Sequence, residues 1–341
     1  MEKLLLEHKL SPGDVIAMTA AVRDLHISYP NQYQTDVETS MMEIWENNPY
    51  ITKLDRNDPS VKHVHLDYPL VHDSNEGMHH FCYAFVWELA QVIGKPIKST
   101  RLKGDIHISD SEKGWFSQVY EILGKDVPYW IIDAGCKNDY TNKLWATDRF
   151  QTVVEAFPKL WFVQVGAKDA GHMHPNLHGE NVINLVGKTD ARQFIRIMYH
   201  ALGVITPVSF PMHLAAAVEV KYDYHRATRP CITIAGGREP TVWEQYTNHA
   251  YMHTCGMLDC CDNGGCWKSR IIPLGDGEGD KDESLCRHPV KLVTGQTIPQ
   301  CMDMISANQI IQKVKDYMGF YNHLPEDKKK EFFTKFPDVA W

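Results

Sequence analysis

The sequence KLLLEHKLSPGDVIAMTAAVR, residues 3–23, decides the fold class of this chain. Its apolar run at 3–6 predicts a short strand, and SPGD at 11–14 predicts a turn. An apolar stripe over residues 14–29 then predicts a helix. A strand, a tight turn and a helix in this order are typical of the first unit of an α/β domain.

The same order of elements recurs further along the chain. Helical patterns separate five apolar runs that predict strands, at 129–133, 160–165, 182–185, 204–206 and 231–234. Strands that alternate with helices form a parallel sheet with right-handed crossovers, and such sheets bind ligands at the carboxyl ends of their strands. We therefore expect an α/β protein whose binding residues directly follow its strands.

The length of 341 residues is enough for two domains. Residues 36–39 predict another N-terminal strand, 41–47 and 76–94 predict helices, and 99–128 lack a strong strand pattern and suit a linker. We place the two domains at 1–125 and 126–320, with a helical tail at 321–341.

Composition and charge exclude some classes of function. The net charge of −8 argues against nucleic acid as the main partner, because phosphate neutralisation needs a basic face. The N-terminal apolar run is too short for a signal peptide or a transmembrane span. We expect a cytoplasmic protein, and in that compartment clustered cysteines hold a metal more often than they form disulfides.

Six of the nine cysteines lie between residues 255 and 301, which predicts a metal-binding module. Cys266, Cys286 and Cys301 are isolated, and each would supply one ligand. The fourth is Cys260 or Cys261. We favour Cys261 because residues 262–265 then form a turn back to Cys266. Four thiolates suit iron or zinc, and the metal would supply the fold of a segment that buries little apolar surface.

Gly13 and Asp14 stand at the first strand–helix turn, where either a structural or a chemical role fits. Glycine lets the backbone approach a ligand closely, and an aspartate here is commonly a helix cap. The alternative is a general base that faces a cleft between the domains.

Three further groups follow predicted strands of the second domain. Lys143 suits a nucleotide pyrophosphate, and His213 begins a helix whose free N–H groups favour anions. Gly236 and Gly237 open the backbone after a strand, while Arg238 and Glu239 are polar enough to meet phosphate or ribose. None of these signals is specific alone.

In their order and spacing these groups resemble glycosyltransferase family 9, the ADP-heptose:lipopolysaccharide heptosyltransferase family. The matching segments cover roughly residues 1–50 and 129–246. They are SPGDVIAMTAAVR at 11–23, KLW at 143–145, LVGKT at 185–189, SFPMHLAAA at 209–217 and GGREPTVW at 236–243. The resemblance implies a GT-B fold, in which two Rossmann-like domains face each other across a cleft.

The resemblance also implies a reaction and a set of site residues. An inverting glycosyltransferase would move a sugar, heptose from ADP-heptose, to an acceptor hydroxyl without a catalytic divalent metal. Asp14 would be the general base. The donor-binding residues would be Gly13, Lys143, Lys137, Ser209, Met212, His213, Gly236, Gly237, Arg238 and Glu239.

The chain departs from the family in three places. Val208 and Phe210 replace the acidic residue and the glycine that usually flank the serine of the third motif. The loop after residue 133 is longer than usual, and its Lys137 is a second candidate for phosphate. The cysteine-rich module is similar in position, though not in spacing, to the four-cysteine iron site of autotransporter heptosyltransferases.

Several alternatives stay open on the sequence. The acceptor can be a glycan, lipopolysaccharide core, a protein or a small molecule, and a homo-oligomer is possible. A nucleotide-sugar epimerase or hydrolase would act without an acceptor. A metal- or redox-sensing protein on the same scaffold would use the cysteine module as its functional part.

Overall fold

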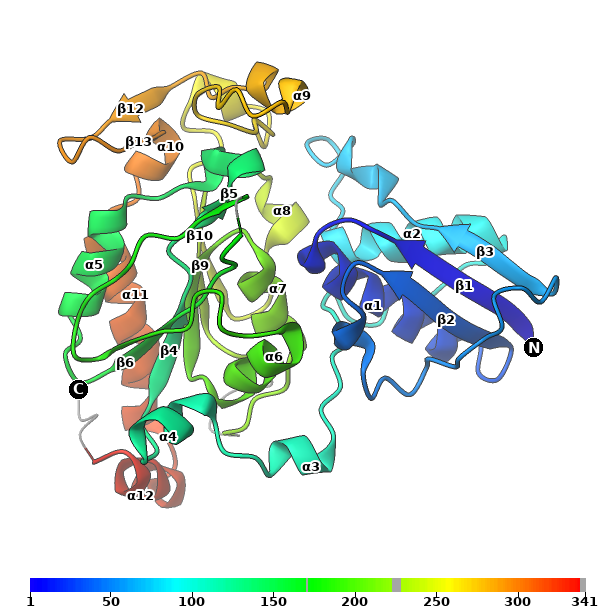
Figure 1. The fold of residues 1–341 in the computed structure, drawn as a ribbon, viewed down its shortest axis with the longest axis horizontal. Coiled ribbons are helices and arrows are strands. Elements are labelled where there is room, and N and C mark those ends of the chain that lie inside the picture. Colours follow the sequence, from blue (N-terminus) through cyan, green and yellow to red (C-terminus); the bar gives the residue numbers. More distant parts are fainter. Residues whose placement is uncertain (170, 223–227, 338–341) are drawn as a thin grey trace.

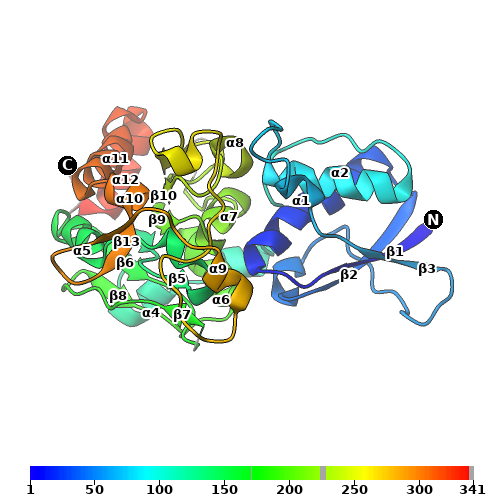
Figure 2. The ribbon, with the colours of Figure 1, turned by 90° about the horizontal axis from the view of Figure 1, so that it is seen from above.

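The computed structural model describes residues 1–169, 171–222 and 228–337. Two sheet-centred domains lie side by side, and the cysteine-rich segment lies at one end of the larger one (Figures 1 and 2). No helix among the described residues is both long and apolar enough to cross a bilayer.

The N-terminal domain is built on three parallel strands in the order β2-β1-β3. These are β1 (Glu2–His8), β2 (Tyr33–Thr39) and β3 (Val61–His65). Helices α1 (Pro12–Ser28) and α2 (Phe81–Ile93) pack on each other and bury their apolar sides with the sheet. The strand arrows point toward the larger domain, so their carboxyl ends lie at the boundary between the two (Figure 1).

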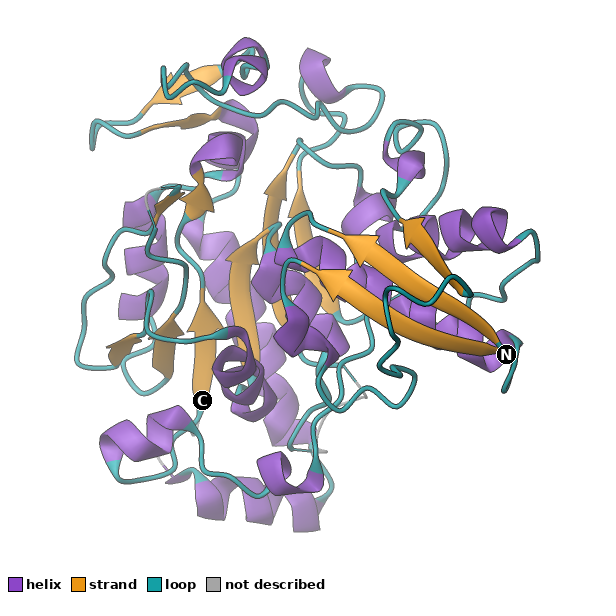
Figure 3. Cartoon of the chain, turned by 45° about the vertical axis from the view of Figure 1, so that its right-hand side comes forward, coloured by secondary structure: helices purple, strands orange, loops and turns teal. Residues whose placement is uncertain are grey.

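The C-terminal domain is a six-stranded parallel sheet in the order β11-β10-β9-β4-β6-β8. Helices lie on both of its faces (Figure 3). The strands are β4 (Tyr129–Ile132), β6 (Trp161–Gln164), β8 (Val182–Asn184), β9 (Gly203–Pro207), β10 (Cys231–Gly236) and β11 (His249–His253). The helices of the domain are α5 (Thr147–Glu155), α6 (Ala191–His200), α7 (Phe210–Ala217), α8 (Thr241–Glu244) and α11 (Ala307–Gly319).

Strand β4 shows how the sheet divides two cores. Tyr129 and Ile131 belong to a cluster that includes α6, α7 and the N-terminal domain, whereas Trp130 and Ile132 pack with α5 and α11. Successive strand residues point to opposite faces, so a strand covered on both faces is apolar throughout. The first cluster runs from one domain into the other, and the domains therefore share apolar packing.

Short elements complete the chain. Helices α3 (Asp110–Lys113) and α4 (Gln118–Leu123) connect the domains, and α4 packs on α6.

The cysteine module, residues 255–301, contains η4 (Asp259–Cys261), α9 (Gly279–Glu283) and the hairpin of β12 (Pro289–Lys291) and β13 (Thr297–Pro299), and it ends in α10 (Gln300–Asp303). The tail forms η5 (Phe320–His323) and α12 (Glu326–Lys335), whose Phe332 is buried in the second core. The remaining short elements are η1 (Met42–Trp45), η2 (Pro69–Val71), η3 (Asn138–Lys143) and the pair β5 (Cys136–Lys137) and β7 (His172–Met173).

Most predicted elements are present, with some differences. The helix predicted at 76–94 starts only at Phe81, because the His80 ring accepts the Cys82 N–H and caps the helix there. The helix predicted at 41–47 is a short 3₁₀ turn, and strands β3 and β11 were not predicted. The linker region is not featureless, since it holds α3 and α4.

The contact between the two central strands requires a glycine. Gly203 of β9 pairs directly with Trp130 of β4. A Cβ atom at residue 203 would lie 2.5 Å from Cε2 of the Trp130 ring. Trp130 is fully buried and cannot move aside without opening the second core.

We predict that Gly203→Ala lowers the free energy of unfolding by about 2 kcal/mol, because overpacking a filled core forces strain. The matched control is Gly319→Ala at the end of α11, where an added Cβ meets nothing within 4 Å. That variant is expected to gain up to about 1 kcal/mol from helix propensity. Urea unfolding of both variants checks this, and equal stabilities would contradict it.

Candidate active site

Asp14 lies where β1 turns into α1, at the edge of the N-terminal sheet that faces the other domain. Its Oδ2 atom accepts the Ser11 N–H at 2.9 Å, so Ser11 is the N-cap of α1 and Asp14 is the third helical residue of a capping box rather than the cap itself. Burial raises the pKa of Asp14 to about 6, while the Ser11 N–H and the charges of Lys143 and Lys137 act to lower it. Both lysines belong to the C-terminal domain, and the carboxyl group therefore lies in the field of residues from across the boundary.

Gly13 allows the two domains to meet closely. A Cβ atom at this position would lie 2.8 Å from Cδ2 of His213, at the start of α7. His213 is buried, and its Nδ1 atom lies 2.7 Å from the hydroxyl of Tyr246. Burial lowers the pKa of His213 to about 3, with Lys143 acting in the same direction, so the ring is neutral. Met212 beside it is also fully buried.

Lys143, Arg238 and Glu239 form one ionic cluster. The Lys143 Nζ atom lies 2.8 Å from Oε1 of Glu239 and donates to the Val208 carbonyl at 3.1 Å. Arg238 pairs with the same Oε1 atom. Burial would raise the pKa of Glu239, but the Arg238 and Lys143 charges outweigh it and hold the pKa below its usual range. Two cations thus share one buried carboxylate.

Aromatic rings hold the Arg238 guanidinium in place. It lies 4.8 Å from the Tyr140 ring centroid and 5.3 Å from that of Trp267, and its Nε atom donates to the Lys268 carbonyl at 2.7 Å. The Arg238 side chain is only 7% exposed. A cation between aromatic faces loses little by leaving water and is fixed in direction.

The predicted glycine loop lies against the cysteine module. Gly236 has φ of 61°, and a Cβ atom there would lie 3.2 Å from Sγ of Cys301. A Cβ atom at Gly237 would lie 2.9 Å from Sγ of Cys261. Both positions therefore need glycine because the module packs on this loop.

Ser209 contacts the carboxylate of Asp133, which was not predicted from the sequence to belong to the site. Its Oγ atom donates to Oδ2 of Asp133 at 3.0 Å and lies 2.8 Å from Oγ1 of Thr206. Asp133 directly follows β4, and Thr206 is in β9, so the group stands at the carboxyl ends of the two central strands. Asp133 is a polar residue directly after an apolar strand, and this pattern is the sequence signal that could have identified it.

A polar hollow of about 620 Å³ lies beside this group, at the ends of β6 and β8. Its lining includes Lys168, Lys188, Asn184 and His174. The side chain of His174 is 5% exposed and its Nδ1 atom lies 3.4 Å from Oδ1 of Asp133. Neither ring nitrogen has a hydrogen-bond partner among the described residues. Lys137 is separate from this hollow's lining, and it pairs with Asp139 at 2.8 Å.

Tyr68 is a second residue that the sequence reading missed. Its φ of 54° is uncommon for a bulky residue and marks a strained turn after β3. The Glu88 carboxylate accepts the Tyr68 N–H at 3.0 Å and so holds this turn. The ring contacts Phe81 with centroids 5.2 Å apart, and Phe81 in turn lies 5.5 Å from His213.

The two candidates for the fourth cysteine ligand differ in burial, since Cys261 is buried and Cys260 is half-buried. Cys261 is buried, and its Sγ atom donates to the Leu258 and Thr254 carbonyls at 3.4 and 3.6 Å. Burial raises the pKa of the Cys301 thiol to about 12, and the thiols of Cys266, Cys286 and Cys260 act in the same direction. Cys261 also lies close to Cys301, because an added Cβ atom at Gly237 would lie 2.9 Å from Sγ of Cys261 and 3.6 Å from Cβ of Cys301. Both candidates therefore lie beside the isolated cysteines.

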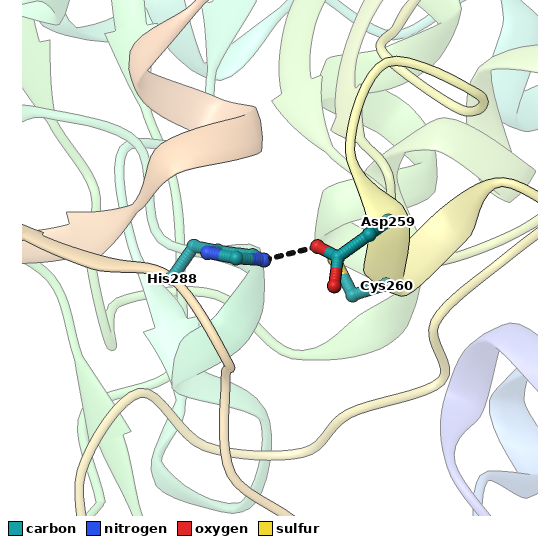
Figure 4. A group of neighbouring side chains, drawn as sticks. All are labelled: Asp259, Cys260 and His288. Atoms are coloured by element: carbon teal, nitrogen blue, oxygen red, sulfur yellow. Dashed lines mark hydrogen bonds and ion pairs between the residues drawn. The ribbon is translucent and has the colours of Figure 1, made fainter.

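Cys260 also belongs to a mixed group at the outer edge of the module. Its thiol lies with Asp259 and His288, and the ligand atoms of all three are within 4.8 Å of one another (Figure 4). Oδ1 of Asp259 is 2.5 Å from Nε2 of His288. Among the described residues, this is the one group of three or more histidine, cysteine or acidic side chains whose ligand atoms all lie within that distance. No four cysteine sulfur atoms of these residues lie that close to one another.

A family comparison matches most of the site. The model of glycosyltransferase family 9 (heptosyltransferase) matches residues 72–258. No curated protein matches the sequence.

Solved structures match nearly the whole chain. A family 9 glycosyl transferase from Veillonella parvula DSM 2008 has a TM-score of 0.58 at 14% identity, over 93% of this chain and 97% of that one. E. coli heptosyltransferase WaaC with ADP gives 0.55 at 12%, over 92% and 99%. Dodecameric iron-containing heptosyltransferase TibC, in complex with ADP-D-beta-D-heptose, gives 0.58 at 12%, over 94% and 78%. At these identities the likeness establishes the fold, and the predicted GT-B architecture is confirmed.

We predict that Glu239→Gln lowers the free energy of unfolding at pH 7 by about 2–3 kcal/mol, because two cations then lack their buried counter-charge. The pKa of Glu239 is lowered in the folded protein. Its contribution is therefore complete above the unfolded-state pKa and fades as pH falls through the folded-state pKa.

The difference between Glu239→Gln and the parent protein should accordingly shrink in acid. Denaturant unfolding at pH 7 and pH 4 measures it, with the exposed Glu180→Gln as the matched control. A variant as stable as its parent at pH 7 would show that the cluster carries no stabilising charge pairing.

Proposed function

The chain belongs to glycosyltransferase family 9 and is a glycosyltransferase; we propose that it transfers heptose from ADP-heptose to an acceptor hydroxyl, with inversion. One observation carries the proposal: a half-buried carboxyl group, Asp14, lies in the field of Lys143 from the opposite domain. A base on one domain and a cation on the other suit a reaction in which acceptor and donor arrive from opposite sides. The ADP and ADP-heptose in the related crystal structures support this choice of donor.

The proposed reaction is a single displacement. The acceptor oxygen attacks the anomeric carbon as Asp14 takes its proton, and the bond from that carbon to the donor diphosphate breaks. The electron pair leaves on the diphosphate oxygen. A base with a pKa of about 6 is mostly ionised at neutral pH, yet it holds a proton more tightly than an exposed aspartate does.

Lys143 and Arg238 are proposed to stabilise the departing diphosphate. They share the Glu239 carboxylate as counter-charge, and two cations in one place suit an anion that gains charge in the transition state. Fixed cations need little reorganisation when that charge develops. The rings of Tyr140 and Trp267 support this fixed arrangement of Arg238.

We propose that the nucleoside part of the donor occupies the polar hollow at the ends of β6 and β8. Ligands of parallel sheets bind at carboxyl strand ends, where this hollow lies. Ser209 and the backbone of Gly236 and Gly237 would line the path from there to Lys143. Met212 and His213, both buried, are proposed to support the donor site from beneath rather than contact the nucleotide.

A structural metal held by Cys260, Cys266, Cys286 and Cys301 is proposed for the module. The donor set consists of sulfur atoms, which suit iron or zinc. The four cysteines fit this role in part. Their thiols interact electrostatically, but the four sulfur atoms do not lie as close together as the ligands of one metal ion. The metal would cross-link the module and would take no part in the transfer. The iron in the related TibC favours this assignment.

We predict that Asp14→Asn lowers heptose transfer by about 10²–10⁴-fold, the usual contribution of a general base. Donor binding should remain, because the donor contacts proposed above belong to the other domain. Thermal shifts with ADP-, UDP-, GDP- and dTDP-linked sugars measure binding, and label transfer from ADP-heptose into cell-extract acceptors measures turnover. The exposed Asp110→Asn is the control.

Stability should separate from activity in Asp14→Asn. The folded protein binds the Asp14 proton more tightly than the usual pKa of 3.8 implies, so ionisation costs stability as pH rises from about 4 to about 6. The variant should therefore be at least as stable as its parent at pH 7. Full transfer by this variant would rule out Asp14 as the base, and no shift with any nucleotide sugar would rule out the proposed donor site.

We predict that Cys260→Ser loses most of the bound metal while Cys261→Ser retains it. Elemental analysis of the purified full-length variants measures iron and zinc per chain. The reverse pattern would return the fourth ligand to Cys261. A parent protein without either metal would show that the thiols serve another purpose.

A further inference from the structure

One side chain of the N-terminal domain pairs with the cysteine module. Nδ2 of Asn75 donates to the Gly265 carbonyl at 2.9 Å, and the Gly265 N–H donates to Oδ1 of Asn75 at 2.8 Å. Asn75 lies in the loop between η2 and α2, and 190 residues separate the two partners. In Figure 1 this loop reaches toward the module from the smaller domain.

The module can accept this side chain because it has two adjacent glycines there. Gly264 has φ of 123°, and a Cβ atom on it would lie 2.7 Å from Oδ1 of Asn75. A Cβ atom on Gly265 would lie 2.3 Å from the Arg238 carbonyl oxygen. The two glycines thus allow close approach on both sides, to the N-terminal domain and to the loop that carries Arg238.

Residues 264–267 of the module are also hydrogen-bonded through their backbone to the glycine loop at 236–239. The Cys266 N–H donates to the Gly237 carbonyl at 3.0 Å, and the Trp267 N–H donates to the Arg238 carbonyl at 3.0 Å. Residues 264–267 therefore lie between Asn75 and the loop at 236–239. This segment is therefore one link between that loop and the N-terminal domain.

The Asn75 pairing is one of several contacts between the domains. Gly13 and His213 meet at the start of α1 and α7, and the ring centroids of Phe81 and Trp243 lie 5.5 Å apart. The Asn75 pairing adds a contact on the module and so limits the motion of the module relative to the N-terminal domain. Asn75 is exposed, so water competes for its amide and the pairing can open and close.

We propose that Asn75 is a positioning residue for sugar transfer. Its amide holds the module, and through the module the Arg238 loop, at a fixed separation from the domain that carries Asp14. This rests on the proposed function, since the separation matters only if a base on one domain acts on a donor held by the other.

The test compares full-length Asn75→Ala with the parent and with Asn57→Ala, an exposed asparagine of the same domain. Hydrogen exchange of the 264–268 peptide should be about tenfold faster in Asn75→Ala, as expected from the loss of two part-buried hydrogen bonds. Release of ADP from ADP-heptose, with water as acceptor, should fall by about tenfold. ADP affinity should stay within about twofold, because the proposed ADP contacts belong to the C-terminal domain.

A second variant addresses the direction of the bonds. Asn75→Asp keeps an acceptor for the Gly265 N–H but sets a carboxylate against the Gly265 carbonyl, so it should not restore turnover. Unchanged exchange in Asn75→Ala, or faster exchange with unchanged turnover, overturns the positioning role. A joint loss of melting temperature and ADP affinity also overturns it, because that pattern marks a structural role. A parent protein that does not bind ADP-heptose overturns the proposed donor instead, and the exchange data then decide whether the pairing exists.

Discussion

The arrangement of the site depends on the buried carboxylate of Glu239. It holds Lys143, which follows the loop after β4, and Arg238, which follows β10. Arg238 in turn contacts Trp267 and the Lys268 carbonyl of the cysteine module. Segments far apart in sequence are thereby joined through one charged group. Because a buried charge must be compensated, these segments cannot rearrange independently of one another.

The sequence predicted the fold well where burial on both faces leaves an unbroken apolar run. The strand at 129–132 is of this kind, and it was expected at 129–133. Strands β3 and β11 escaped because their sequences, VKHVH and HAYMH, mix polar and apolar residues. Both lie at the edges of their sheets, where one side is not paired and the pattern is weaker.

The sequence predicted the positions of some site residues after strands. Lys143, Arg238 and Glu239 were expected there individually, and the structure brings them into one ionic cluster. Contacts over long sequence separations were not predictable from spacing. Asn75 meets Gly265 across 190 residues, and Asp133 meets Ser209 across 76.

The contact between Gly13 and His213 has a consequence for how this sequence can vary. An added Cβ atom on Gly13 would lie 2.8 Å from the His213 ring, and the ring is enclosed by Tyr246 and Phe81. Neither position can grow alone. Among relatives that keep this closeness of the domains, residues 13 and 213 should covary, with a smaller side chain at 213 wherever glycine is lost at 13. An alignment would then show the contact between the domains as two covarying positions, 200 residues apart in the sequence.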